Sequence, residues 1–288
     1  MFKIGNVELG SHCKPFIIAE LSANHNGSLD KAKQLIAAAA SAGVSAVKIQ
    51  TYTADSMTLD TDMPGFKIEG GLWDGYSLYD LYQEASTPYE WHQALFDYAA
   101  QLGVILFSSP FDENAVDFLD SLYAPAFKVA SFEMVDLPLI RYIASKKKPI
   151  LISTGMSNES EIGEALEVAR QSGARDILLF HCVSGYPTPL EESKLSNIQF
   201  LKKHFNVEVG LSDHTLGHSA AIASIALGAV AIEKHFTLDR NDKGPDSEFS
   251  LEPVEFKALV DESFGIWTAL QYSHELKRSV VEKQNKQF

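Results

Sequence analysis

The sequence predicts a (β/α)8 barrel, an α/β fold, and three observations lead to this prediction. Short apolar runs of four to eight residues alternate with longer amphipathic segments along almost the whole chain. Most of these runs are apolar on both faces, as the strands of a buried parallel sheet are. The length of 288 residues suits one barrel, which typically takes about 250. An open doubly wound sheet is the alternative, but no G-x-G-x-x-G follows a predicted strand.

The eight predicted strands share a high content of Val, Ile, Leu, Phe and Ala, and most are followed by polar or turn-forming residues. In chain order they are residues 16–21, 46–50, 104–108, 126–131, 149–153, 177–181, 207–212 and 229–233.

The helices between these strands have recognisable ends. Ser28 precedes the amphipathic segment 29–42 and Gly43 follows it, which indicates an N-cap and a C-terminal glycine. Further helices are expected between Pro88 and about Gly103, between Ser157 and about Gly173, and from Pro253 to about Tyr272.

The connection from 52 to 87 is much longer than the other connections. It contains the glycine-rich string GGLWDG at 70–75. Long loops on a compact fold usually serve a function, because a structureless insertion has no packing reason to persist. We therefore expect it to lie over the mouth of the barrel.

The composition excludes several classes of partner. With 24 Lys and Arg against 38 Asp and Glu, the net charge is −14, which argues against general affinity for nucleic acid or anionic membranes. The beginning of the sequence lacks the pattern of a signal peptide, and no apolar stretch approaches the ~18 residues of a membrane span. Cys13 and Cys182 match no disulfide or metal-finger pattern. We expect a soluble cytoplasmic protein with free thiols and small-molecule substrates.

Polar residues stand at the carboxyl ends of the predicted strands, where barrels of this class build their active sites. Lys48 and Lys128 each lie near the end of an apolar strand. A single such lysine has a structural explanation, in which the amine reaches water or a carboxylate. Burying two costs several kcal/mol unless anions compensate. Both lysines, with the strand-end serines, would form a cup for a phosphate or carboxylate; these serines are Ser109, Ser131, Ser153 and Ser212.

Two histidines, His214 and His235, follow the seventh and eighth strands, which are neighbours in a closed barrel. Imidazoles that converge from adjacent strands can bind a divalent metal, and Glu20 on the first strand lies next to the eighth. A structural role for each histidine is the alternative, because their spacing is no local metal motif.

Several long strings resemble the sialic acid synthase family, in order and over nearly all of residues 1–272. They are IIAELSANHNGS at 17–28, KIQTY at 48–52, FKVASFE at 127–133, STGM at 153–156, HCVSGYPTP at 181–189, GLSDHT at 210–215 and IEKHFTLD at 232–239. Within the family, the run FKIEGGLWDGYSLYDLY at 66–82 looks like that of enzymes that make pseudaminic acid. Enzymes that make N-acetylneuraminic or legionaminic acid are the alternative.

The resemblance implies a metal-dependent condensation of phosphoenolpyruvate with 2,4-diacetamido-2,4,6-trideoxy-L-altrose, which yields a nine-carbon sugar acid and phosphate. It implies His214 and His235 as ligands of Mn²⁺, Mg²⁺ or Co²⁺, and Glu20 as the acid or base. A structural ion pair of Glu20 with Lys48 or Lys234 is the alternative. The implied phosphoenolpyruvate residues are Lys48, Ser109, Lys128, Ser131, Ser153, Ser184 and Ser212, and the implied sugar residues are Gln50, Tyr186 and Asp246. Ser184 departs from the asparagine usual in the family.

Two other classes remain open from the residues alone. A Schiff-base aldolase would use Lys48 or Lys128 as a nucleophile. A barrel that only binds a sugar phosphate would need no catalytic group.

The family resemblance also implies what surrounds the barrel. Its members continue into a small domain resembling type III antifreeze protein, which covers the partner's barrel in a swapped homodimer and supplies an arginine to the sugar site. We expect a barrel at 1–272 with an N-terminal extension, and the start of a linker at 273–288 with that domain missing. Without it, the sugar pocket would be open to water and the activity low or absent.

Overall fold

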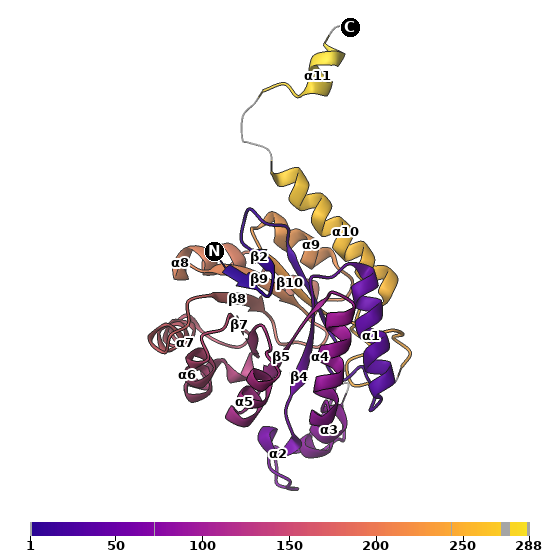
Figure 1. Ribbon diagram of the computed structural model, residues 1–288, viewed down its shortest axis with the longest axis vertical. Coiled ribbons are helices and arrows are strands. Elements are labelled where there is room, and N and C mark those ends of the chain that lie inside the picture. Colours follow the sequence, from indigo (N-terminus) through magenta and orange to yellow (C-terminus); the bar gives the residue numbers. More distant parts are fainter. Residues whose placement is uncertain (1, 72, 243, 272–276, 287–288) are drawn as a thin grey trace.

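Eight parallel strands close into a barrel in the computed structural model, which describes residues 2–71, 73–242, 244–271 and 277–286 (Figure 1). All eight predicted strands are confirmed, and closure through the pairing of the last strand with the first excludes the open sheet. The strands are β3 (Phe16–Glu20), β4 (Ala46–Thr51), β5 (Ile105–Pro110), β6 (Phe127–Val129), β7 (Ile150–Ser153), β8 (Ile177–Cys182), β9 (Glu208–Asp213) and β10 (Ala231–His235).

Helices surround the barrel, as the alternation of the sequence predicts (Figure 1). The Ser28 side chain accepts a hydrogen bond from the Lys31 amide at the start of α1, and Gly43 ends this helix with a φ of 88°. The helix at 157–173 begins later than expected, because Asn158 is its N-cap. The helices are α1 (Leu29–Ala42), α4 (His92–Gln101), α5 (Glu113–Ser121), α6 (Leu137–Ser145), α7 (Glu159–Gln171), α8 (Asn197–Phe205), α9 (Ser219–Ala226) and α10 (Pro253–Leu270).

Side chains alternate between the two faces of each strand, and the two faces belong to two separate hydrophobic clusters. Residues that face outward, such as Ile17, Val47 and Ile152, pack in one cluster with the surrounding helices. Their inward neighbours, such as Phe16 and Ile18, fill the barrel's interior in a second cluster. Farther along each strand the inward positions become polar, so that the carboxyl end of the barrel carries the reactive groups.

An antiparallel hairpin, β1 (Phe2–Ile4) and β2 (Val7–Leu9), precedes the first barrel strand. Its buried residues Phe2, Ile4 and Leu9 belong to the same cluster as the barrel's interior residues. The hairpin therefore closes the amino end of the barrel, opposite the polar end.

The long connection after β4 reaches the carboxyl end, as predicted. It contains α2 (Ala54–Met57) and α3 (Leu78–Ala85). The backbones of Lys67 and Ser77 pair in an isolated antiparallel β-bridge at the base of the glycine-rich turn. The Trp73 indole N–H donates to the Pro245 carbonyl at 3.0 Å, so this loop contacts the segment that follows β10.

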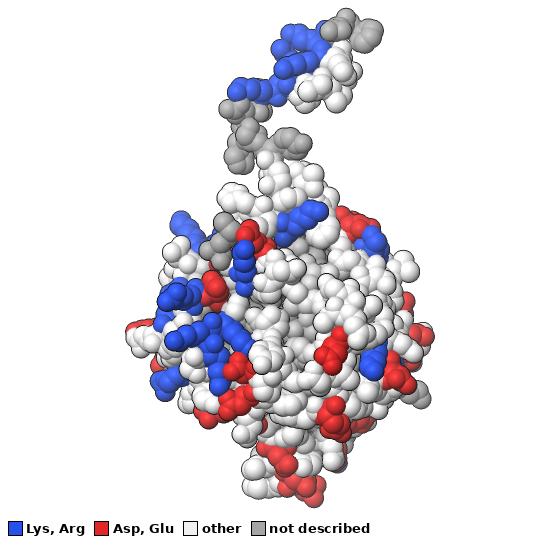
Figure 2. Space-filling view, in the orientation of Figure 1, with Lys and Arg blue, Asp and Glu red and all other residues white. Residues whose placement is uncertain are grey.

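The remaining predictions concern the surface and the C-terminal residues. Acidic and basic side chains are mixed on the face drawn in Figure 2. None of the described helices is long and apolar enough to cross a membrane, and both cysteines are free. Within the expected linker, 273–276 and 287–288 lie outside the described residues, and α11 (Val280–Asn285) buries no side chain.

Candidate active site

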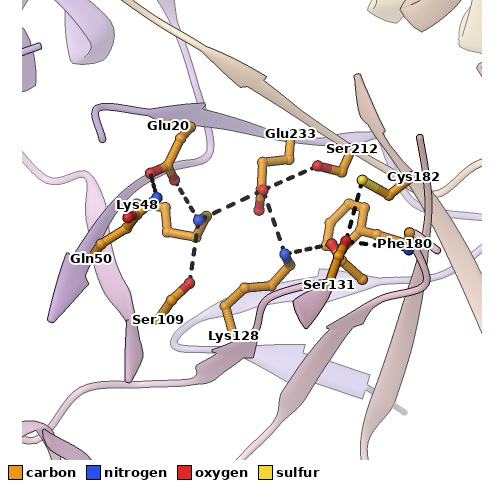
Figure 3. A network of polar contacts seen from close by, with 12 residues as sticks. Glu20, Lys48, Gln50, Ser109, Lys128, Ser131, Phe180, Cys182, Ser212 and Glu233 are labelled. Atoms are coloured by element: carbon orange, nitrogen blue, oxygen red, sulfur yellow. Dashed lines mark hydrogen bonds and ion pairs between the residues drawn. The ribbon is translucent and has the colours of Figure 1, made fainter. Parts of the chain in front are cut away.

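Two lysines and two carboxylates from β3, β4, β6 and β10 meet inside the polar end of the barrel (Figure 3). Lys48 Nζ lies 2.6 Å from Glu20 Oε2 and 3.6 Å from Glu233 Oε1. Lys128 Nζ lies 3.5 Å from the same Glu233 oxygen. All four side chains are at least nine-tenths buried, and their formal charges cancel.

The environment treats the two carboxylates differently. Burial disfavours the charge of Glu233, but Lys128 and Lys48 outweigh it and hold the pKa of this carboxyl below its ordinary value. Burial raises the pKa of Glu20; attraction to Lys48 opposes the shift, and the charge of Glu233 adds to it. Glu20 is therefore the better group of the two to hold a proton.

Serine hydroxyls complete the cup around the lysines. Lys48 Nζ donates to Ser109 Oγ at 3.3 Å, and Lys128 Nζ donates to Ser153 Oγ at 2.6 Å. The Ser212 hydroxyl donates to Glu233 Oε1 at 3.3 Å. The structure thus brings together the lysines and three of the serines that the sequence singles out for an anion site.

Two more serine hydroxyls, those of Ser131 and Ser184, lie beside this cup. The Gly155 amide donates to Ser131 Oγ at 3.2 Å, and the Ser131 hydroxyl donates to Cys182 Sγ at 3.5 Å. Ser184 Oγ is buried and has no hydrogen-bond partner among the described residues. Its capacity to donate is therefore left for a ligand or water.

The two predicted histidines face each other, with ring centroids 5.3 Å apart. His214 Nδ1 lies 3.0 Å from the Val183 carbonyl, which can only accept, so Nδ1 carries a hydrogen. Burial lowers the pKa of His214, but Cys182 outweighs it and raises the pKa above its ordinary value, so Nε2 offers a lone pair to a metal once the ring gives up its second proton. Burial and the neighbouring His214 lower the pKa of His235, which keeps its ring neutral. Its Nδ1 is buried and has no hydrogen-bond partner among the described residues.

These donors fit a divalent metal that takes two ligands from the protein and the others from water or substrate. Across the described residues, no group of three or more His, Cys, Asp or Glu side chains is arranged to hold a metal ion. The orphaned Nδ1 of His235 is a buried atom that such an ion would satisfy.

The predicted sugar residues border the histidines and Glu20. Gln50 Nε2 donates to Glu20 Oε1 at 3.3 Å, and the Tyr186 ring lies 4.4 Å from that of His214. Asp246 Oδ2 lies 4.0 Å from His235 Nδ1. Burial raises the pKa of Asp246, although hydrogen bonds from Ser22 and the Ala23 backbone oppose the shift. The three side chains form the outer part of the site.

Asn24 fastens the loop that carries Asp246. Its amide nitrogen donates to the Phe236 carbonyl at 2.8 Å and to Ser250 Oγ at 2.9 Å, while its oxygen accepts from Ser247 Oγ at 3.1 Å. Asn24 is fully buried. The loop after β10 is therefore attached to the loop after β3.

Lys234 points to the other side of β10 from Glu233 and His235. Its ammonium group lies 2.7 Å from Asp213 Oδ2 and donates to the Thr215 carbonyl at 2.7 Å. Of the two structural partners considered for Glu20, the ion pair therefore forms with Lys48 and not with Lys234.

Residues 35–275 match the model of the NeuB family. The chain belongs to the NeuB family. This membership confirms the family resemblance that the motifs predict.

Named relatives in the NeuB family are similar over most of the chain. The pseudaminic acid synthase of Campylobacter jejuni is 49% identical over 259 residues, which cover 90% of this chain and 75% of that protein. The N,N'-diacetyllegionaminic acid synthase of the same species is 41% identical and is matched over 85% of this chain and 74% of its own length. Each of these matches covers at least 85% of this chain.

A solved structure of an N-acetylneuraminic acid synthetase shares the fold. The N-acetylneuraminic acid synthetase of Leptospira borgpetersenii superposes with a TM-score of 0.88 at 29% identity, covering 99% of this chain and 94% of that one.

Two buried carboxylates have places in this NeuB-family site that sequence reasoning did not assign. Glu233 lies between Lys48 and Lys128 and contacts both. The sequence could have indicated this role, because Glu233 stands two residues before His235 and so points to the same face of the strand. Glu133 follows β6 in the segment Phe132–Val135, and its Oε2 is buried and has no hydrogen-bond partner among the described residues. Burial raises the pKa of Glu133 to about 7.

Gly155→Ala should raise KM for phosphoenolpyruvate by about 10- to 100-fold, the equivalent of about 1–3 kcal/mol of crowding. An added Cβ would lie 2.3 Å from Ser184 Oγ and 2.6 Å from Ser131 Oγ, so both hydroxyls would have to move. Steady-state kinetics at saturating sugar measure the change. Gly163→Ala is the control, because its Cβ would meet only Phe205 at 3.8 Å; an equal KM in both variants would contradict the prediction.

Glu133→Gln should stabilise the protein at pH 8 by at most about 3 kcal/mol. The pKa of Glu133 is raised from 4.5 to about 7, so its contribution to stability is full below pH 4.5 and is lost as the pH rises through 7. Glutamine cannot ionise, and the gain should shrink at pH 5. Denaturant unfolding at both pH values tests this against Glu164→Gln, an exposed residue of α7. A gain that is the same at both pH values would show that charge is not its cause.

Proposed function

We propose that this chain is a pseudaminic acid synthase, which condenses phosphoenolpyruvate with 2,4-diacetamido-2,4,6-trideoxy-L-altrose. The observation that carries the proposal is the convergence of two buried lysines and two histidines at one barrel end. The 49% identity to a pseudaminic acid synthase, against 41% to a legionaminic acid synthase, favours this sugar.

Phosphoenolpyruvate would bind in the cup formed by Lys48, Lys128 and the strand-end serines. The lysine charges and the Ser109 and Ser153 hydroxyls are already directed inward by their mutual contacts. Preorganised donors of this kind stabilise charge without reorganising during the reaction. Ser184 would use its free hydroxyl on the phosphate.

The sugar reacts as its open-chain aldehyde, which the enol carbon of phosphoenolpyruvate attacks. A divalent metal held by His214 and His235, with Mn²⁺ our first choice over Mg²⁺ or Co²⁺, would supply Lewis-acid polarisation when bound. Gln50, Tyr186 and Asp246 would orient the sugar so that C1 faces the enol carbon.

Glu20 would handle the proton of the second step. Carbon–carbon bond formation leaves cationic character at C2 of the former phosphoenolpyruvate, where water adds and gives a proton to Glu20. The resulting hydroxyl gives its proton to the departing phosphate as it forms the keto group and the C–O bond to phosphate breaks, with the electron pair leaving on phosphate. The proton taken up by Glu20 goes to the alkoxide that carbon–carbon bond formation leaves on the former aldehyde oxygen. Lys128 and Lys48 would stabilise the departing charge.

Phosphate release from phosphoenolpyruvate, measured with each sugar in turn, tests the proposal. We expect turnover with the L-altro sugar that exceeds turnover with N-acetylmannosamine or with the legionaminic acid precursor. Phosphoenolpyruvate carrying ¹⁸O in the bridging position should deliver that label to phosphate, because the C–O bond breaks. Greater turnover with another sugar would reassign the substrate.

Borohydride trapping separates this proposal from a Schiff-base aldolase. Burial lowers the pKa of Lys48, but Glu20 and Glu233 outweigh it and raise the pKa above its ordinary value, so this amine stays charged. Burial lowers the pKa of Lys128, and Glu233 offsets only part of the shift, so Lys128 is the amine that the trapping experiment must test. Reduction in the presence of sugar should leave the protein's mass unchanged. A covalent adduct on Lys48 or Lys128 would overturn the metal-dependent mechanism.

A homodimer and a linker that begins near residue 273 remain part of the proposal. The chain covers 75% of the Campylobacter pseudaminic acid synthase, and the family resemblance implies a further domain over the partner's barrel. Light scattering of this chain would give its oligomeric state. A high KM for the sugar would indicate that its sugar site lacks contacts.

A further inference from the structure

Trp73 lies on the glycine-rich turn of the long loop and contacts the sugar side of the site. Its indole N–H donates to the Pro245 carbonyl at 3.0 Å, next to Asp246. Its ring lies 6.1 Å from the ring of Tyr186, at a tilt of 53°. A residue more than a hundred positions away in the chain thus borders the predicted sugar site.

Trp73, Tyr186 and Phe249 form an aromatic wall over the histidine pair. The Tyr186 ring lies 4.4 Å from that of His214 and 5.5 Å from that of Phe249, and the Phe249 ring lies 4.9 Å from that of His235. Trp73 is at the outer end of this wall and is half-buried. Part of its surface is therefore open to a ligand.

The free surface of Trp73 is apolar. Its single donor, Nε1–H, is engaged by Pro245, and an indole has no other hydrogen-bonding group. A ligand that packs on this ring would meet carbon and the π face, whereas Asp246, next to Pro245, and Gln50, next to Glu20, offer polar groups deeper in the site. A sugar with one deoxygenated end matches this division.

We propose that Trp73 is a specificity-determining residue that packs against the C6 methyl end of a 6-deoxy acetamido sugar. This inference rests on the proposed function, in which C1 lies at the histidines and the lysine cup. The other end of the six-carbon chain then points outward along the wall, toward Trp73. A 6-hydroxyl group would lose water there and find no partner on the indole.

The test compares the 6-deoxy sugar with its 6-hydroxy counterpart in wild type, Trp73→Ala and Trp73→Phe. We expect wild type to prefer the 6-deoxy sugar by about 10- to 100-fold in kcat/KM, and Trp73→Ala to reduce the preference to about 3-fold or less. Trp73→Phe should retain most of it, because the ring remains. KM for phosphoenolpyruvate should stay unchanged in both variants.

Tyr79→Phe is the matched control, because it removes only a hydroxyl that contacts Asp55 on the same long loop, and Tyr79 does not line the cavity that Trp73 borders. An unchanged preference in Trp73→Ala, or an equal loss in Tyr79→Phe, would overturn the inference. Failure of the proposed function looks different, since wild type would then turn over another acetamido sugar. The 6-deoxy and 6-hydroxy pair of that series applies the same test to Trp73.

Discussion

Lys128→Ala should lower kcat/KM for phosphoenolpyruvate by about 100- to 1,000-fold. The ammonium group is buried between Glu233 Oε1 at 3.5 Å and Ser153 Oγ at 2.6 Å. Its removal takes away a charge that would stabilise the departing phosphate. Steady-state kinetics with phosphoenolpyruvate varied at saturating sugar measure the effect.

Two comparisons separate this effect from loss of the fold. Removing one partner of a buried ion pair typically costs about 3–5 kcal/mol of stability, so Lys128→Met, which keeps the stem's packing, should be measured beside it with a thermal unfolding curve. Lys148→Ala removes a lysine that pairs with Asp120 at 2.6 Å outside the barrel and should leave the kinetics unchanged. A folded Lys128→Met protein with wild-type kinetics would remove Lys128 from the site.

His214→Ala and His235→Ala should each abolish measurable activity and weaken Mn²⁺ binding by at least about 100-fold, since each would remove a direct ligand. The rings face each other at 5.3 Å, and the contact of His214 Nδ1 with the Val183 carbonyl leaves Nε2 available. Calorimetric titration with Mn²⁺ in the absence of substrate tests binding without reference to turnover.

His204→Ala supplies the control for the metal titration. This histidine pairs with Glu159 on the helices outside the barrel, at 2.9 Å, and its loss should change neither activity nor Mn²⁺ affinity. An unchanged Mn²⁺ isotherm in His214→Ala or His235→Ala would eliminate the proposed metal site, whatever the activity of the variant.

The strands could be predicted from the sequence because their period and composition are local. A strand buried on both faces reads as an apolar run, and a polar residue at its carboxyl end is visible without the fold. Lys48 and Lys128 stood out for this reason. The hairpin Phe2–Leu9 did not, since its two strands have three residues each and too few positions to show a period.

The pairing inside the site could not be predicted in the same way. Whether Glu20 joins Lys48 or Lys234 depends on which strand faces point inward, and that follows from barrel closure. Glu233 meets both lysines only because the last strand pairs with the first. Sequence identifies the groups, and three-dimensional closure decides their partners.

The balance of charge among Glu20, Lys48, Lys128 and Glu233 has a thermodynamic consequence. These four groups already neutralise one another in a buried space, so an anion that enters adds negative charge that they do not offset. Its binding must then be linked to uptake of positive charge, either a proton or a divalent cation. The apparent affinity for phosphoenolpyruvate would accordingly report how much metal or acid is present, and a single dissociation constant would describe only the conditions of its measurement.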